Sequence, residues 1–92
     1  MRKIPLEPGR AALSKAGRDA GRRFAVLRVD GTFAYIADGD LRKAESPKKK
    51  KHRHLRATQE FFPSLAEILK NGKVPLDSEI RRCLSDKTPR ED

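Results

Sequence analysis

Short apolar runs, each closed by a turn signal, fill the first two thirds of the chain. Residues 10–15, 23–29 and 33–37 each have the composition of a strand, and the run at 23–29 is apolar enough for a central one. A short, charged strand at 41–45 and a last strand at 55–58 complete the pattern. Several short strands with closely spaced turn signals favour a small all-β barrel.

Turn residues separate these runs. Asp30-Gly31-Thr32 predicts a tight hairpin, and Asp38-Gly39-Asp40 predicts a second turn that explains both of its aspartates. In the strand at 33–37, Phe33 and Tyr35 share one face. The chain has few aromatic residues, so we expect at least one of these two in the core, although either is a candidate platform for a stacked base.

The hydrophobic period changes to a helical one after residue 60. Pro63 suits a first helical turn, and Asn71-Gly72 is a good C-terminal stop. Between them, Leu65, Ile68 and Leu69 fall on one side of the expected helix. The spacing therefore predicts one helix from about residue 63 to 70.

A second helix is expected to start at Asp77 as its N-cap. Its apolar stripe is Ile80, Cys83 and Leu84, so Cys83 has a packing role rather than that of a nucleophile. We expect this helix to cover the barrel, since so small a sheet benefits from a covering helix. Docking on a protein partner is the alternative.

The expected organisation is therefore mainly β: a small SH3-like barrel with one or two C-terminal α-helices. Residues 1–8 form an N-terminal tail, and residues 9–58 form the barrel, which includes a basic arm at 47–56. Residues 59–86 form a helical extension, and residues 87–92 form a flexible tail.

The net charge of the chain limits the kinds of binding partner to consider. The 92 residues include 22 Lys and Arg against 13 Asp and Glu, a net charge of +9. Such a balance indicates a polyanionic partner, nucleic acid first and an acidic membrane surface second. The single cysteine excludes an internal disulfide and fits a reducing, cytoplasmic compartment. No signal peptide follows Met1, and no apolar run approaches ~20 residues, so we expect no membrane span.

One basic loop stands between the first two strands. Gly17 and Gly21 punctuate residues 14–23, and glycine allows the positive φ of a tight, shaped loop. Four cations surround the two glycines: Lys15, Arg18, Arg22 and Arg23. An ordinary basic turn is the alternative, but cations on a fixed backbone are suited to phosphate contacts. Arg18 is the foremost candidate, because its guanidinium can bind phosphate or stack on a base.

A second basic element follows the predicted strand at 41–45. Its candidate RNA-binding residues are Arg42, Lys43, Lys48, Lys49, Lys50, Lys51, His52, Arg53, His54 and Arg56. We interpret this element as a second phosphate-binding arm that RNA could order on binding. The alternatives are a disordered solvating run and a nuclear-import signal. In an extended segment His52 and His54 would face the same way, but further ligands are missing nearby, so we expect no metal site.

Seven segments carry a resemblance to a known family: residues 8–10, 14–22, 24–27, 36–39, 42–43, 47–51 and 54–58. This part of the chain resembles a KOW-type SH3-like domain. It is similar to the ribosomal large-subunit protein fourteen family of eukaryotes and archaea, and closer to the short bacterial KOW-domain RNA-binding proteins. The family's characteristic loop glycine falls on Gly21. Ala20 stands where lysine is common, and residues 59–75 are a longer insertion than the bacterial members carry.

The resemblance implies a partly open barrel that binds ribosomal RNA or a ribosome-associated particle. The residues themselves contain no carboxylate pair, Ser-His-Asp set or P-loop, so we expect a non-enzymatic RNA-binding module without cofactor. RNA is the expected partner, with ribosomal proteins as further candidates and no small-molecule substrate. The alternative is a protein-interaction adaptor that uses the barrel or an apolar surface at 61–84. Nonspecific DNA binding is a third hypothesis.

Overall fold

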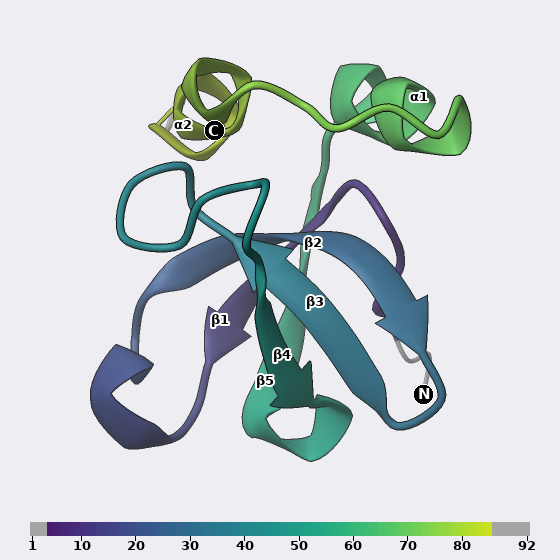
Figure 1. Cartoon of the computed structure of the whole chain (residues 1–92). Helices are drawn as coiled ribbons and strands as arrows, with labels where there is room; N and C mark the ends of the chain where they lie inside the picture. The colour runs from purple at the N-terminus through teal and green to yellow at the C-terminus, as the bar shows by residue number, and fades with distance from the viewer. Residues whose placement is uncertain (1–3, 86–92) are drawn as a thin grey trace.

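The computed structural model of the chain describes residues 4–85, so the predicted tail at 87–92 lies outside the described residues. Five strands form one antiparallel sheet in the order β4-β3-β2-β1-β5 (Figure 1). The strands are β1 (Arg10–Ser14), β2 (Arg23–Asp30), β3 (Phe33–Ala37), β4 (Lys48–Lys51) and β5 (Leu55–Phe61). Two single-turn helices, η1 (Gly17–Asp19) and η2 (His52–His54), and two α-helices, α1 (Pro63–Lys70) and α2 (Asp77–Ser85), complete the fold.

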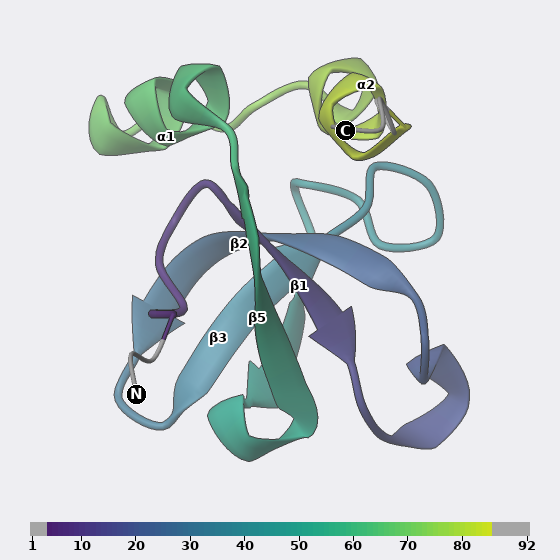
Figure 2. The ribbon, with the colours of Figure 1, turned by 180° about the vertical axis from the view of Figure 1, so that it is seen from behind.

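The sheet is open but strongly curved. β4 and β5 stand at opposite edges of the strand order, yet only the three residues of η2 join them. Figures 1 and 2 show α1 and α2 together on one side of the sheet. The η1 loop, η2 and the β2–β3 turn lie at the opposite end in both views.

The curved sheet is buried on both of its faces. One core cluster, inside the curve, consists of Ala12, Phe24, Val26, Ala34, Ile36 and Leu55. The other, beneath the helices, consists of Ala11, Ala25, Leu27, Ala37, Ala44, Leu65, Ile80 and Leu84. Successive residues of a strand point to opposite faces, and β2 supplies side chains to both clusters. The predicted central strand is thereby confirmed.

Residues 59–75, the apparent insertion, complete the fold. β5 continues to Phe61, beyond the predicted end at residue 58, and α1 follows within two residues. Pro63 opens α1 as predicted, because its fixed φ suits a first turn. Leu65 is fully buried and Leu69 packs against the same cluster. The insertion therefore forms part of the cover over the outer side of the sheet.

The second helix packs on the sheet as predicted, with Ile80 and Leu84 buried. Asp77, however, is its first residue rather than its N-cap. The Asp77 carboxylate accepts the backbone N–H of Ala44 at 2.7 Å, so it anchors the β3–β4 connection to the helix. The Glu79 carboxylate instead accepts the N–H of Leu76, just before the helix, at 2.9 Å.

The predicted strand at 41–45 is wrong, since this segment lies in the irregular connection between β3 and β4. The Asp38 carboxylate accepts the backbone N–H groups of Asp40 and Arg42 at 2.9 and 2.8 Å, and Asp77 takes that of Ala44. Side-chain acceptors thus satisfy donors that a strand would use for its ladder. The fourth strand is instead the lysine run Lys48–Lys51, which pairs with β3.

Candidate nucleic-acid interface

The basic loop between β1 and β2 has a defined backbone. Gly17 and Gly21 take φ values of +77° and +87°, as their glycine identity predicts. The Gly21 N–H donates to the carbonyl of Ser14 at 2.8 Å, and the Ser14 N–H donates to that of Arg22 at 3.0 Å. A Cβ on Gly21 would meet nothing within 4 Å, so the loop needs this glycine for its φ and not for close approach.

A buried carboxylate fixes this loop to the rest of the fold. Asp19 lies in η1, and its Oδ2 is 3.3 Å from Arg42 Nη2 and 3.6 Å from Lys48 Nζ. Burial acts to raise the pKa of Asp19, but the hydrogen bond and charge of Arg42, with the charges of Lys48 and Lys50, outweigh it. The net pKa is lower than usual, and the carboxylate stays ionised at neutral pH.

The side chains of the four β4 lysines alternate between the two faces of the strand. Lys48 and Lys50 are half-buried and turn toward the η1 loop, where Lys50 Nζ donates to the carbonyl of Ala16 at 3.3 Å. Lys49 and Lys51 are exposed and stand opposite Tyr35 and Phe33 in the β3–β4 pairing. The alternation of a strand therefore divides one lysine run into two structural and two exposed cations.

The structure brings the two predicted basic elements together. The backbone N–H of Lys15 donates to the carbonyl of His54 at 2.8 Å, which joins the β1–β2 loop to η2. Both elements lie at the end of the sheet farthest from the helices (Figure 1). We call their exposed cations the η1–η2 surface: Lys15, Arg18, Lys51, Arg53 and Arg56.

The other predicted site residues have protein contacts or lie elsewhere. Arg22 is exposed but pairs with Asp38 at 2.9 Å. Arg23 is half-buried and bonds both to Glu60 of β5 and to the carbonyl of Leu84, so it ties α2 to the sheet. Arg42 is half-buried against Asp19, whereas Lys43 is exposed on the β3–β4 connection.

The two histidines lie on η2 and not on an extended segment, so the expectation that they share one face of a strand is wrong. His52 Nε2 lies 3.1 Å from the carbonyl of Phe33. A carbonyl oxygen only accepts hydrogen bonds, so Nε2 carries the proton in this arrangement. His52 thereby holds η2 against β3.

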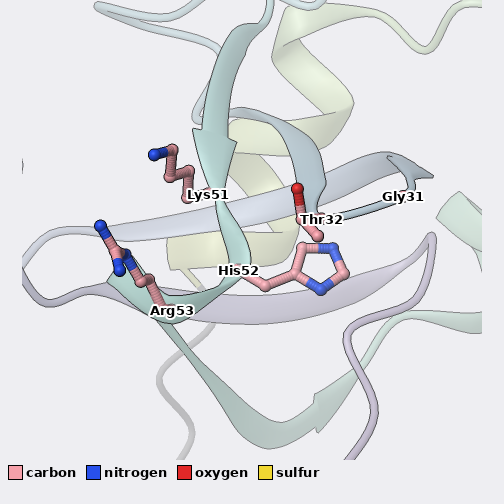
Figure 3. A pocket seen from close by; sticks show the side chains of 5 residues that line it. All are labelled: Gly31, Thr32, Lys51, His52 and Arg53. Carbon is pink, nitrogen blue, oxygen red and sulfur yellow. The ribbon is translucent and has the colours of Figure 1, made fainter.

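A surface pocket of about 400 Å³ lies beside η2 and is lined by Gly31, Thr32, Lys51, His52 and Arg53 (Figure 3). The imidazole of His52 lies next to Thr32, while Lys51 and Arg53 extend together on the other side of the chain (Figure 3). The chain at η2 therefore directs His52 toward the β2–β3 turn and its two exposed cations, Lys51 and Arg53, to the opposite side.

Sequence reasoning missed two features of this region. Asp19 was recognisable only as the lone acid among the loop's cations, and nothing in the sequence revealed that Arg42 and Lys48 bind it. Phe33 and Tyr35 do share a face as predicted, but neither belongs to a core cluster, so the expectation of at least one core aromatic is wrong. Both rings are half-buried on the outer side of β3.

Replacing Asp19 with asparagine is expected to lower the free energy of unfolding by about 1–2 kcal/mol at neutral pH, because Arg42 loses a charged acceptor. Asp19 has a lower pKa folded than its ordinary 3.8, so its contribution is present above that pH and is lost as the pH falls through the folded value. Urea unfolding at pH 7 and pH 3 measures this. A variant whose stability falls with acid as steeply as wild type would contradict the assignment.

No family model matches the chain, and no curated protein matches it significantly in sequence. Within residues 4–85, no three His, Cys, Asp or Glu side chains gather in a way that would hold a metal ion. In the same range, no helix is both long and apolar enough to cross a membrane.

Proposed function

We propose that the protein is a non-enzymatic RNA-binding module that binds ribosomal RNA or a ribosome-associated particle. The observation that carries the proposal is the η1–η2 surface, where two basic segments distant in sequence meet through the Lys15–His54 hydrogen bond. Exposed cations on a fixed backbone are suited to the phosphates of RNA, which supply most of the affinity in such complexes.

The ion pairs of two buried carboxylates support the proposed RNA-binding function. Arg42 and Lys48 neutralise Asp19, and Arg22 pairs with Asp38, so the local carboxylates do not repel a phosphate. Lys15, Arg18, Arg53 and Arg56 form no ion pair within residues 4–85 and keep their charge for a ligand. Phosphate contacts are therefore assigned to the exposed cations, and Arg23, Arg42, Lys48 and Lys50 support the fold.

The finer fold assignment belongs to the same proposal: a partly open SH3-like barrel of the KOW type. The three-residue link between the two edge strands and the core cluster inside the curve support it. Gly21, the position of the characteristic glycine in that resemblance, has the positive φ that a glycine favours.

Reversing two charges on the η1–η2 surface should weaken RNA binding. For the double variant Arg18→Glu with Arg53→Glu, we expect about 10- to 100-fold weaker binding near 0.1 M salt. Each phosphate contact contributes roughly −0.7 to the log–log salt slope on a single strand and roughly −0.9 on a duplex, so losing two contacts should make the slope shallower by roughly 1.4 to 1.8. Fluorescence anisotropy with labelled RNA at several salt concentrations measures both quantities.

The matched control is Lys70→Glu with Arg82→Glu, which makes the same change of net charge at two exposed positions on α1 and α2. Arg22 is unsuitable for reversal, because a glutamate there would face the buried Asp38 carboxylate. If the double variant remains folded and binds RNA as wild type does, the η1–η2 surface is not the phosphate site and the proposal fails.

Association with ribosomes is tested by sedimentation of cell lysate through sucrose gradients at low and high salt. The proposal expects the protein to migrate with a ribosomal subunit at low salt and to be released by high salt or ribonuclease. Protein that stays at the top of the gradient under every condition would remove the ribosome from the proposal. Competition with duplex DNA separates RNA binding from nonspecific DNA binding.

The protein-interaction adaptor, the alternative function, has less exposed apolar surface available than the sequence predicted. The helices bury Leu65, Ile80 and Leu84 against the sheet, so the predicted 61–84 apolar surface is largely internal. Val74 and Leu76, in the linker between α1 and α2, are 61% and 65% exposed and remain available to a partner. Deleting residues 60–92 would uncover the core, so Leu76→Ser is the better test: it should weaken partner capture without affecting RNA binding.

A further inference from the structure

The outer face of β2, β3 and β4 is only partly covered by the helices. Near the β2–β3 turn, Tyr35 stands between Arg28 of β2 and Lys49 of β4 in the strand pairing. Phe33 stands between Asp30 and Lys51 in the same way. We call Arg28, Phe33, Tyr35, Lys49 and Lys51 the aromatic face.

Cations lie over both rings of the aromatic face. Lys49 Nζ is 4.4 Å from the centre of the Phe33 ring, and Arg28 Cζ is 4.9 Å from that of Tyr35. Arg28 and Lys49 are themselves exposed, so each ring presents a face to solvent rather than to the core. Exposed cation–π contacts are weaker than the stacking of a base on an aromatic ring, so a base can replace either cation.

A hollow lies at each end of the aromatic face. The pocket beside η2 shares Lys51 with it. At the other end, a cleft of about 180 Å³ between the sheet and the α1–α2 linker is lined in part by Arg28, Tyr35 and Lys73. The two rings thus lie between two hollows, and exposed cations are present at both ends of the aromatic face. Asp30, beside Phe33, is the one acid among these strand-paired residues, and it pairs with Arg28 at 3.6 Å.

Resting on the proposed function, we propose that the aromatic face binds an unpaired segment of the target RNA, with successive bases stacked on Phe33 and Tyr35. The displaced side chains of Lys49 and Arg28, together with Lys51, then contact the phosphates. Adjacent aromatic residues on one strand face are about 6.7 Å apart. Stacked nucleotides rise only about 3.4 Å, so the bases must be splayed as they are in unpaired RNA.

Lys51 connects the aromatic face to the η1–η2 surface. Lys51 belongs to both the aromatic face and the η1–η2 surface, so phosphates held by η1–η2 lead directly to the two rings. A duplex held at the η1–η2 surface cannot offer its paired, stacked bases to a flat ring. Together the two surfaces therefore fit an RNA helix that continues into a single-stranded segment.

Tyr35 supplies a direct measurement, because the chain has one tyrosine and no tryptophan. We expect an RNA hairpin with an unpaired 3′ extension of six nucleotides to quench Tyr35 fluorescence at least twofold. The same hairpin without the extension should bind through η1–η2 and leave the fluorescence unchanged, which also corrects for absorption by the RNA.

Substitutions test the same idea through affinity. Phe33→Leu and Tyr35→Leu should each weaken binding of the extended hairpin about tenfold and leave that of the blunt hairpin unchanged. Phe61→Leu is the matched control, since Phe61 is an exposed aromatic with Arg10 over its ring at 5.2 Å, but it lies on β5 at the other edge of the sheet. This control should bind both hairpins as wild type does.

The outcomes separate the two proposals. Equal quenching by both hairpins, or none by either while anisotropy shows that both bind, would overturn the aromatic face as a site for unpaired RNA and leave the η1–η2 surface intact. Binding of neither hairpin would overturn the proposed function itself. Unequal quenching, together with the loss of affinity in the two leucine variants alone, is the result that the inference requires.

Discussion

Replacing Gly39 with alanine is expected to lower the free energy of unfolding by about 3–5 kcal/mol, one of the largest losses that a single methyl group can cause in this fold. Gly39 lies in the turn after β3, directly beneath α2. A Cβ built at this position would lie 2.4 Å from the carbonyl oxygen of Asp77. That oxygen is backbone in the first turn of α2, so the whole helix would have to shift.

Two further features of Gly39 increase the expected loss of stability in Gly39→Ala. Gly39 takes a φ of +78°, which L side chains rarely adopt. Its carbonyl accepts a hydrogen bond from Arg81 Nη1 at 2.6 Å, and a shift of α2 would break this bond. Moving α2 would also expose Ile80 and Leu84, which are buried against the sheet.

Gly21→Ala is the matched control. Gly21 has a similar φ of +87°, but a Cβ there would have nothing within 4 Å, so only the conformational cost of about 1–2 kcal/mol remains. Urea unfolding followed by circular dichroism compares the two variants with wild type. If both alanines destabilise the protein equally, α2 does not approach Gly39 as closely as the structure indicates.

The close approach at Gly39 has a consequence for the proposed RNA-binding surface. α2 holds the β3–β4 connection through Asp77 and Arg81, and Arg42 of that connection binds Asp19 in η1. The cations of the loop thus depend on a chain of contacts that begins at the C-terminal helix. In the proposed function, α2 of the helical extension therefore helps to position the cations of the η1 loop.

Local patterns were enough to predict most elements of the fold. The β2–β3 hairpin follows from Asp30-Gly31-Thr32, since glycine suits the turn between two apolar runs. α1 follows from Pro63 and the spacing of Leu65 and Leu69, which are local signals at its start and along its buried face. These features depend on neighbours within a few residues, and sequence reasoning sees such neighbours directly.

Predictions failed where a partner distant in sequence decides the structure. Ala44 is kept out of a strand by Asp77, a residue 33 positions later. In the sequence Gly39 resembles any turn glycine. Only the structure shows that α2 also leaves no room for a Cβ at this position. Lysines 48–51 look alike in sequence, but the strand directs Lys48 to Asp19 and Lys49 to Phe33. The candidate site is therefore recognisable from its composition, whereas the division between structural and exposed cations is not.

Truncating Ile80 to alanine is expected to lower the free energy of unfolding by about 3–5 kcal/mol, in the upper part of the range for such changes. Ile80 is fully buried, in a cluster whose sheet side is built largely from alanines: Ala11, Ala25, Ala37 and Ala44. Such small side chains cannot move into the space that Ile80 leaves, so the cavity stays open and its full cost applies. For a domain of this length, the loss is comparable to the lower end of the expected stability, about 5 kcal/mol.

Ile80→Val is the matched control, and it should cost only about 0.5–1.5 kcal/mol because it removes one methylene. Urea unfolding of both variants gives the comparison, and Tyr35 fluorescence serves as a second probe. If Ile80→Ala costs no more than the valine variant, the cluster can close around the gap and α2 is not held by this side chain. If Ile80→Ala remains folded but α2 is displaced, the contacts that lead from Asp77 through the β3–β4 connection to Asp19 are expected to weaken with it.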